Sequence, residues 1–161
     1  MNLQKLFQLQ KELNDRILTE HNLDNFSISP KRILALQVEL GELANETRCF
    51  KYWSTKEPSS KEVILEEFVD CLHFILTIGL DKDFCDIDVE TIDSEYSLTD
   101  QFLNLYIDLN DLVITSSKDH YVTLFEDFLS LGHTLGFTTQ DIEEAYLEKN
   151  KKNHLRQDKG Y

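Results

Sequence analysis

Residues 59–80 read SSKEVILEEFVDCLHFILTIGL, a mostly apolar run that opens with a Ser and a Glu at capping-box spacing. An α-helix turns by about 100° per residue, and at that pitch Glu67 falls inside the apolar stripe while Asp70 lies at its edge. The stretch therefore predicts a helix from Ser59 to about Leu80 that carries two acidic side chains beside its buried face.

A second pair of acids precedes this stretch. Ser29-Pro30 has the residues favoured at a helix N-cap and first turn, and it predicts a helix that runs to about Phe50. Within that helix Glu39 and Glu42 lie about 60° apart, next to apolar residues. The sequence thus carries an ExxE pair and an ExxD pair on two consecutive helices, with a loop at 51–58 between them.

The rest of the pattern is helical as well. Apolar periodicity and capping residues predict further helices over residues 2–22, from Ser97, from about Asp119 to Leu135, and from Thr138 into the tail, with a linker at 81–97. On the helix from Ser97, the apolar residues expected on one side are Phe102, Leu105, Tyr106, Leu109 and Val113. We therefore predict an all-α fold, a bundle of about six helices with a four-helix core that carries the acids, in a single domain over residues 1–161.

Composition and charge narrow the function classes. The 161 residues include 30 Asp and Glu against 16 Lys and Arg, a net charge of −14 that disfavours non-specific binding to nucleic acid. The apolar stretch at 71–80 is too short for a transmembrane helix and no signal peptide is visible, so no membrane association is expected. Cys49, Cys71 and Cys85 include no close-spaced pair, and we interpret them as reduced thiols of a cytoplasmic protein.

Four acids that face one space need a compensating positive charge. Burying a carboxylate is costly, and the two helices carry few inward-facing basic residues. A divalent cation is the remedy that the residue types favour, because hard oxygen ligands suit Mg²⁺, which also keeps substrate phosphate in its shell. There are two alternatives. One is ordinary acids on a helix surface. The other is a di-iron site, which needs Glu-x-x-His from two helices, whereas Asp70-x-x-His73 occurs once and no second copy exists.

The order of the motifs resembles a known family. Glu39-Leu-Gly-Glu42 followed by Glu67-Phe-Val-Asp70 is similar to the all-α nucleoside triphosphate pyrophosphatases. More narrowly, the chain resembles the dimeric dUTPases of phages and their bacterial hosts through Leu9-Gln-Lys-Glu-Leu-Asn14, Phe50-Lys-Tyr-Trp53 and the tail from Tyr146 to Tyr161. The resemblance covers most of the chain and is least clear over residues 81–120, which we interpret as a variable and partly accessory segment.

The resemblance implies a reaction and a cofactor. dUTP and water would give dUMP and pyrophosphate, with dUDP as a second substrate, which limits uracil in DNA and supplies dUMP. Glu39, Glu42, Glu67 and Asp70 would hold Mg²⁺, for which Mn²⁺ could substitute, and the catalytic acids Glu39 and Glu42 would act on the attacking water, with Glu39 favoured as the base. The dimeric family suggests attack at the β-phosphorus, although the sequence itself selects neither α nor β.

The resemblance also assigns substrate contacts, each with a plainer alternative. Gln10 and Asn14, inside the apolar stripe of the first helix, would read the uracil edge or be satisfied core amides. Trp53 would stack on the base or close the core, and His73 would contact sugar or base or else face solvent. The expected contacts in the tail are Lys149, Asn150, Asn153, Arg156 and Tyr161, although a helix C-terminus favours cations through its dipole alone.

The family further implies a homodimer in the cytoplasm, that of a bacterial host if the chain is phage-encoded. Two alternatives stay open for the function. One is another all-α pyrophosphatase, MazG-like or dCTP-cleaving. The other is a regulator that binds a repressor protein of a mobile genetic element, with catalysis secondary. Acidic residues together with Ile87, Val89, Ile92 and Tyr96 make segment 81–120 the candidate contact surface for such a repressor.

Overall fold

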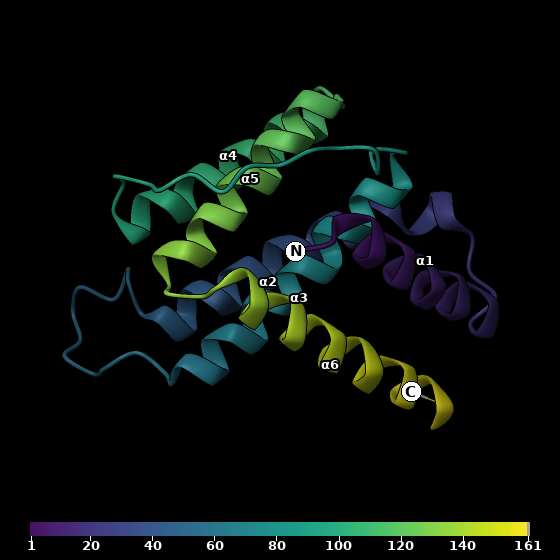
Figure 1. Ribbon diagram of the computed structural model, residues 1–161, viewed down its shortest axis with the longest axis horizontal. Helices are drawn as coiled ribbons and strands as arrows, with labels where there is room; N and C mark the ends of the chain where they lie inside the picture. The colour runs from purple at the N-terminus through teal and green to yellow at the C-terminus, as the bar shows by residue number, and fades with distance from the viewer. Residues whose placement is uncertain (161) are drawn as a thin grey trace.

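Every regular element in the described part of the chain is an α-helix. The computed structural model describes residues 1–160. Its helices are α1 (Leu3–Glu20), α2 (Asn25–Thr47), α3 (Lys61–Asp81), α4 (Leu98–Ile114), α5 (Lys118–Thr134) and α6 (Thr139–Asp158) (Figure 1). The predicted all-α fold with six helices is therefore confirmed, as is the irregular linker between α3 and α4.

The central helix is α3, which packs against α1, α2, α5 and α6. Nearly all of its second half is buried, including Cys71, Leu72, Ile75 and Leu76. A helix that is apolar around most of its circumference has to be surrounded by others. In Figure 1, α1 and α6 lie on one side of the α2–α3 pair, and the hairpin of α4 and α5 lies on the other.

The start of α2 differs from the prediction. The helix begins at Asn25, and the side chain of Asp24 caps it by accepting a hydrogen bond from the backbone N–H of Ser27. The prediction that Ser29 caps this helix and that Pro30 opens it is wrong, since Pro30 lies inside the helix. Pro30 removes a hydrogen bond to the carbonyl of Phe26, which lies in the exposed first turn where water can replace it.

Smaller differences affect α3 and α4. Ser60 is the N-cap residue of α3, and the predicted cap Ser59 instead donates its hydroxyl to the Glu46 carboxylate of α2, which fastens the loop end to that helix. On α4 the residue turned inward is Leu112, whereas the predicted Val113 is exposed. The predicted starts of α4 at Ser97 and of α6 at Thr138 are confirmed, the latter by a complete capping box with Asp141.

Close packing at Gly132 predicts a stability loss. A Cβ added to Gly132 of α5 would lie 2.6 Å from Cζ of Phe68, whose ring stacks on Phe128 at 4.1 Å. We expect Gly132→Ala to lower the free energy of unfolding by about 1–3 kcal/mol, because the stacked rings cannot move aside in a packed core. Urea unfolding followed by circular dichroism measures the change.

Gly41 of α2 supplies the matched control. Its added Cβ would lie 3.5 Å from the Tyr106 hydroxyl oxygen, an ordinary contact. Gly41→Ala should therefore stabilise the protein by up to about 1 kcal/mol, the gain in helix propensity. Equal losses in the two variants would contradict the packing at Gly132.

A pair of carboxyl groups joins α4 to α5. Asp108 lies against Asp127, with Asp111 and His120 nearby, and its Oδ2 is buried without a hydrogen-bond donor among the described residues. Burial, and then repulsion by Asp127, raises the pKa of Asp108 to about 7. Two acceptors in contact are satisfied by one shared proton.

The raised pKa of Asp108 gives the protein a pH-dependent stability. Between its ordinary value of 3.8 and about 7, the folded state binds more protons than the unfolded chain. The free energy of unfolding should therefore fall as pH rises through this window, and Asp108→Asn should remove that part of the fall. Unfolding midpoints from pH 4 to 8 measure it. If the pH profile of Asp108→Asn is the same as that of the wild type and of the exposed control Asp88→Asn, the pairing of Asp108 with Asp127 is contradicted.

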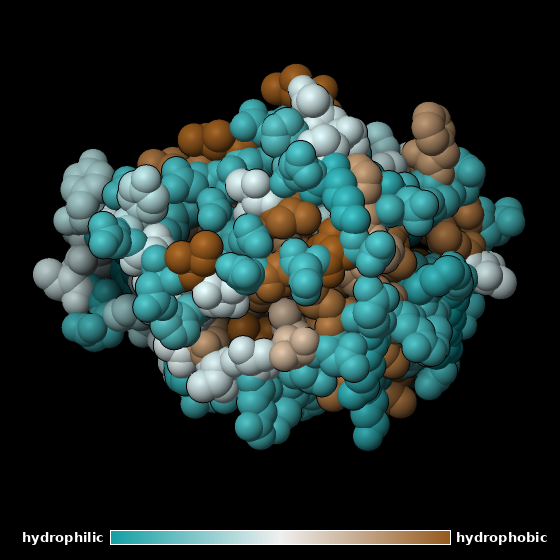
Figure 2. Space-filling model, turned by 45° about the horizontal axis from the view of Figure 1, so that its top comes forward, coloured by the Kyte–Doolittle hydropathy of each residue, from teal (hydrophilic) through white to brown (hydrophobic). Residues whose placement is uncertain are grey.

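The surface is mainly hydrophilic on the face shown in Figure 2, where apolar residues gather in a hollow near the middle of the view. None of the helices within residues 1–160 is both long enough and apolar enough to span a bilayer.

Candidate active site

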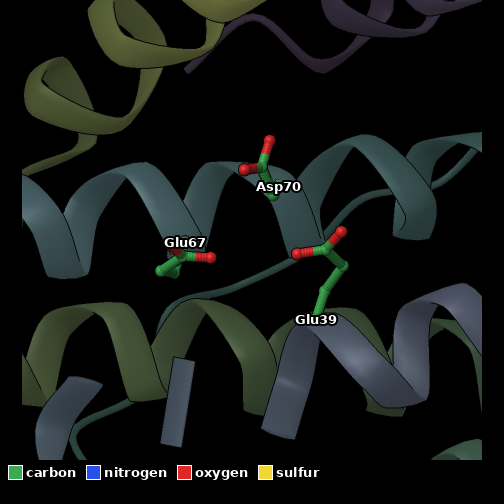
Figure 3. A group of neighbouring side chains, drawn as sticks. All are labelled: Glu39, Glu67 and Asp70. Carbon is green, nitrogen blue, oxygen red and sulfur yellow. The ribbon is translucent and has the colours of Figure 1, made fainter. Parts of the chain in front are cut away.

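Three half-buried carboxylates from α2 and α3 converge where the two helices pack together. Oxygen atoms of Glu39, Glu67 and Asp70 all lie within 4.8 Å of one another. Figure 3 shows Glu39 extending from α2 toward α3, where Glu67 and Asp70 lie one turn apart. The spacing of three residues puts the α3 pair on one side of the helix, and the packing of α2 on α3 brings the third acid to them.

Glu42 lies next to this group without being part of it. It is exposed, one turn after Glu39 on α2, and its charge raises the pKa values of both Glu39 and Glu67. The predicted quartet is thus a compact trio with a fourth acid at its solvent side.

The surroundings of the three acids disfavour their ionised forms. Burial raises the pKa of Glu39 to about 7, with further contributions from Asp70, Glu42 and Glu67. Burial also raises the pKa values of Glu67 and Asp70. Clustered oxygen donors of this kind repel one another until a cation binds between them. The donor set is hard oxygen throughout and fits a divalent metal ion.

Lys149 of α6 supplies part of the missing positive charge. Its ammonium donates to Oδ2 of Asp70 at 2.6 Å and to Oε1 of Glu66 at 3.1 Å. Only 10% of the Lys149 side chain is exposed. These contacts lower the pKa of Glu66, but at Asp70 the effect of burial outweighs them, so the pKa of Asp70 still rises.

A cavity of about 330 Å³ opens beside the carboxylates. Four helices line it, with Gln10 and Asn14 from α1, Arg32 and Glu39 from α2, Asp70, His73 and Thr77 from α3, and Lys149, Asn153 and Arg156 from α6. Glu39 and Asp70 give the cavity its acidic groups, and basic, amide and apolar side chains border the rest. The structure therefore brings together most of the residues that the sequence singled out, from positions 10 to 156.

Hydrogen bonds order the amide-rich wall of the cavity. The Gln10 amide nitrogen donates to Oδ1 of Asn14 and to Oγ1 of Thr77, both at 3.0 Å. The Gln10 amide oxygen lies 2.6 Å from Nδ1 of His73 and accepts from the Tyr146 hydroxyl at 2.9 Å. His73 is buried, and burial lowers its pKa to about 3.

Three residues of this region escaped the sequence analysis. Arg32 is buried beside the cavity, where its guanidinium donates to Asn25 and to Asp81 at the end of α3. Thr77 lies one turn after His73 in the same apolar stripe, and this polar interruption was the signal that could have identified it. Tyr146 had no such signal, since a Tyr at a helical apolar position normally belongs to the core.

Other predicted site residues lie elsewhere. Trp53 does not line the cavity: it is 65% exposed in the loop after α2, where its ring meets those of Phe50 and Tyr52 edge-on. Asn150 is buried and also lies outside the cavity lining, next to Tyr146. Tyr161 lies outside the described residues.

A larger hollow, of about 1100 Å³, lies between the N-terminus, residues 86–91 and the junction of α5 and α6. It holds no acidic trio of the kind formed by Glu39, Glu67 and Asp70. Chemistry rather than size therefore marks the smaller cavity as the candidate active site.

The comparison with protein families agrees with this geometry. A family model described as dUTPase matches residues 2–161, nearly the whole chain. No curated protein matches the chain. The match covers both acid pairs, the amide-rich wall of α1 and the lysine of α6 that meets Asp70. The chain belongs to the dUTPase family, in its all-α form, and is a dUTP diphosphatase.

Proposed function

We propose that the protein is a Mg²⁺-dependent enzyme that hydrolyses dUTP, and also dUDP, to dUMP at the carboxylate cluster of α2 and α3. The observation that carries the proposal is the approach of Glu39, Glu67 and Asp70 oxygens to within 4.8 Å beside a cavity of about 330 Å³. With Glu42 as a fourth ligand, these acids would hold Mg²⁺ or Mn²⁺, which would neutralise phosphate charge in the reaction.

Glu39 is the residue we propose as the base that orients and deprotonates the attacking water. It comes from the helix opposite the other two acids of the trio, so it can face a water molecule that approaches from the cavity. Without a metal ion, burial and the neighbouring acids raise the pKa of Glu39 to about 7. Glu42, one turn away and exposed, would assist from the solvent side.

The α6 face of the cavity suits the phosphates. Lys149, Asn153 and Arg156 line it, and their donors can reach several oxygens of one pyrophosphate group. Asp70 would be one of the ligands of a bound metal ion, and we propose that the Lys149 ammonium, which contacts Asp70 here, would bind a substrate phosphate. Asn150 and Tyr161 were also predicted to contact substrate, and we retain them as candidates.

The α1 face of the cavity suits the base and the sugar. Asn14 and His73 line it beside Gln10, and uracil carries both donors and acceptors on its edge. Trp53 is exposed and does not line the cavity, so we propose that its predicted stacking on a base would use the loop after α2 of a second copy of the chain.

We propose a homodimer formed through the apolar face of α2 and α4. Leu34 and Val38 of α2 and Leu103 and Ile107 of α4 are exposed at one-turn spacing, and an apolar hollow of about 260 Å³ lies between the two helices. Light scattering of the native chain should give twice the monomer mass. Ile107→Glu should give monomers, and the equally drastic Phe26→Glu, at an exposed residue in the first turn of α2, should not.

A repressor-binding role of segment 81–120 is retained as a second proposal. Ile92 and Tyr96 are exposed on the irregular part of this segment, although Ile87 and Val89 pack against the core and are not available. We place both activities in a single domain that works in the cytoplasm, that of a bacterial host if the gene belongs to a phage.

A comparison of nucleotide substrates tests the substrate assignment. Pyrophosphate release is measured with Mg²⁺ from dUTP, dCTP, dTTP and UTP, each supplied separately at equal concentration, and dUDP is followed by release of phosphate. We expect dUTP to have the highest kcat/KM by a wide margin. A preference for dCTP, or equal rates for all four triphosphates, would contradict uracil recognition and favour a dCTP-cleaving or MazG-like enzyme.

A further inference from the structure

Every polar atom of the Gln10 amide is engaged by protein groups. The amide nitrogen donates to Asn14 and Thr77, and the amide oxygen faces two groups, the Tyr146 hydroxyl at 2.9 Å and Nδ1 of His73 at 2.6 Å. A buried amide with two donated and two accepted hydrogen bonds has no capacity left for a ligand. Gln10 therefore borders the cavity without being free to read a base.

The Gln10 oxygen determines where His73 carries its proton. A carbonyl oxygen can only accept, so the ring nitrogen that faces it at 2.6 Å has to be Nδ1–H. A neutral imidazole has one N–H, and burial keeps His73 neutral. The second ring nitrogen, Nε2, is then a bare acceptor.

Nε2 is the atom that the protein leaves without a partner. His73 is only 6% exposed, its ring stacks on Tyr146 at 4.4 Å, and Nε2 has no hydrogen-bond partner among the described residues. The residue lines the cavity beside the carboxylates. A buried acceptor without a donor is costly, and a ligand that supplies an N–H or O–H removes that cost.

We propose that Gln10 and Tyr146 are positioning residues that hold His73 in its Nδ1–H tautomer, so that Nε2 accepts a hydrogen bond from the nucleoside of the substrate. This inference rests on the proposed function for the identity of the ligand. A deoxyuridine nucleotide offers two donors of the required kind, the imide N3–H of uracil and the 3′-hydroxyl of the sugar. Cytosine has no N3–H, so the first contact would also discriminate against dCTP.

The tautomer can be observed without any substrate. In protein labelled with nitrogen-15 histidine, two-bond proton–nitrogen correlations distinguish a protonated ring nitrogen from a bare one, and His73→Gln identifies the signals of His73 among the five histidines. We expect a protonated Nδ1 and a bare Nε2 at neutral pH. A proton on Nε2, as would follow if the Gln10 amide were rotated by half a turn, would overturn the proposal.

Removing the Gln10 amide should allow the ring proton of His73 to move from Nδ1 to Nε2. Gln10→Met keeps the length of the side chain but no acceptor, so we expect the His73 proton to move wholly or partly to Nε2, with a smaller shift in Tyr146→Phe. The KM for dUTP should rise about 10-fold in Gln10→Met, the effect of one lost hydrogen bond, while kcat changes little. Gln8→Met, on the exposed side of the same helix, is the matched control and should change neither quantity. An unchanged tautomer of His73 in Gln10→Met would refute the proposal that Gln10 holds the proton on Nδ1.

Two analogues identify the donor. N3-methyl-dUTP lacks the imide N–H, and the 2′,3′-dideoxy analogue of dUTP lacks the 3′-hydroxyl. The analogue that lacks the true donor should bind the wild type more weakly and lose no further affinity in Gln10→Met, whereas the other should lose the same factor as dUTP. If both lose that factor, Nε2 contacts neither group and the proposal fails. If the wild type does not hydrolyse dUTP at all, the proposed function fails. The tautomer measurement would still show whether Gln10 and Tyr146 hold His73 in its Nδ1–H form.

Discussion

Glu39→Gln is expected to lower kcat for dUTP hydrolysis by about 10²–10⁴-fold, the range typical of a lost general base. The amide keeps the size of the side chain but can neither take a proton from water nor supply a full charge to a metal ion. Folding should not suffer, because burial and the neighbouring acids already oppose the ionised form of Glu39. The variant should therefore be at least as resistant to urea as the wild type and still be almost inactive.

Steady-state pyrophosphate release and urea unfolding on the same preparation test this expectation. Glu144→Gln, an exposed acid on α6 that contacts Gln140, is the control and should keep full activity. A Glu39→Gln enzyme with more than a tenth of the wild-type kcat would show that Glu39 is not the general base. Loss of stability would show instead that the carboxylate has a structural partner.

Lys149→Met is expected to destabilise the metal-free protein by about 3–5 kcal/mol, the cost of breaking a buried ion pair from one side. The side chains of Lys149 and Asp70 are 10% and 20% exposed, so water screens their interaction little. Without the ammonium, Asp70 and Glu66 lose the cation that contacts both of them. Excess Mg²⁺ should restore most of the loss, because a ligand that binds the folded state alone stabilises it.

Thermal unfolding with and without Mg²⁺ measures the effect. Lys152→Met supplies the control: Lys152 is exposed on the same helix and pairs with Glu148 at the surface, where such pairs contribute little. We expect Mg²⁺ to raise the melting temperature of Lys149→Met more than that of the wild type, since in the wild type the ion must displace Lys149 from Asp70. Equal shifts would contradict this competition.

The helical fold and the acids were accessible from the sequence for a simple reason. Helical periodicity is a local property, and it placed Glu67 and Asp70 beside the buried face of α3 and Glu39 beside that of α2 before any tertiary contact was known. The start of α2 was missed because Ser29-Pro30 is a strong local signal. Asp24 was the better cap, and an exposed first turn tolerates a proline.

The partners of individual site residues could not be predicted from the sequence, because they depend on tertiary contacts. Gln10 was predicted to lie inside the apolar stripe of the first helix and to read a base or be a satisfied core amide. The two groups that face its amide oxygen come from α3 and α6, which helical spacing alone does not place. Likewise Lys149 was predicted to bind phosphate, and its pairing with Asp70 depends on how α6 crosses α3. The solitary tryptophan, Trp53, was a candidate for stacking on a base, yet it is exposed and does not line the cavity.

The most direct test of the central claim is pyrophosphate release from dUTP as Mg²⁺ is added back to chelator-treated protein. We predict no turnover without a divalent ion, a saturable return of activity with Mg²⁺, and dUMP and pyrophosphate as the only products. Full turnover in the presence of excess chelator would contradict the account. It would mean that hydrolysis does not need the metal ion that Glu39, Glu67 and Asp70 are proposed to bind.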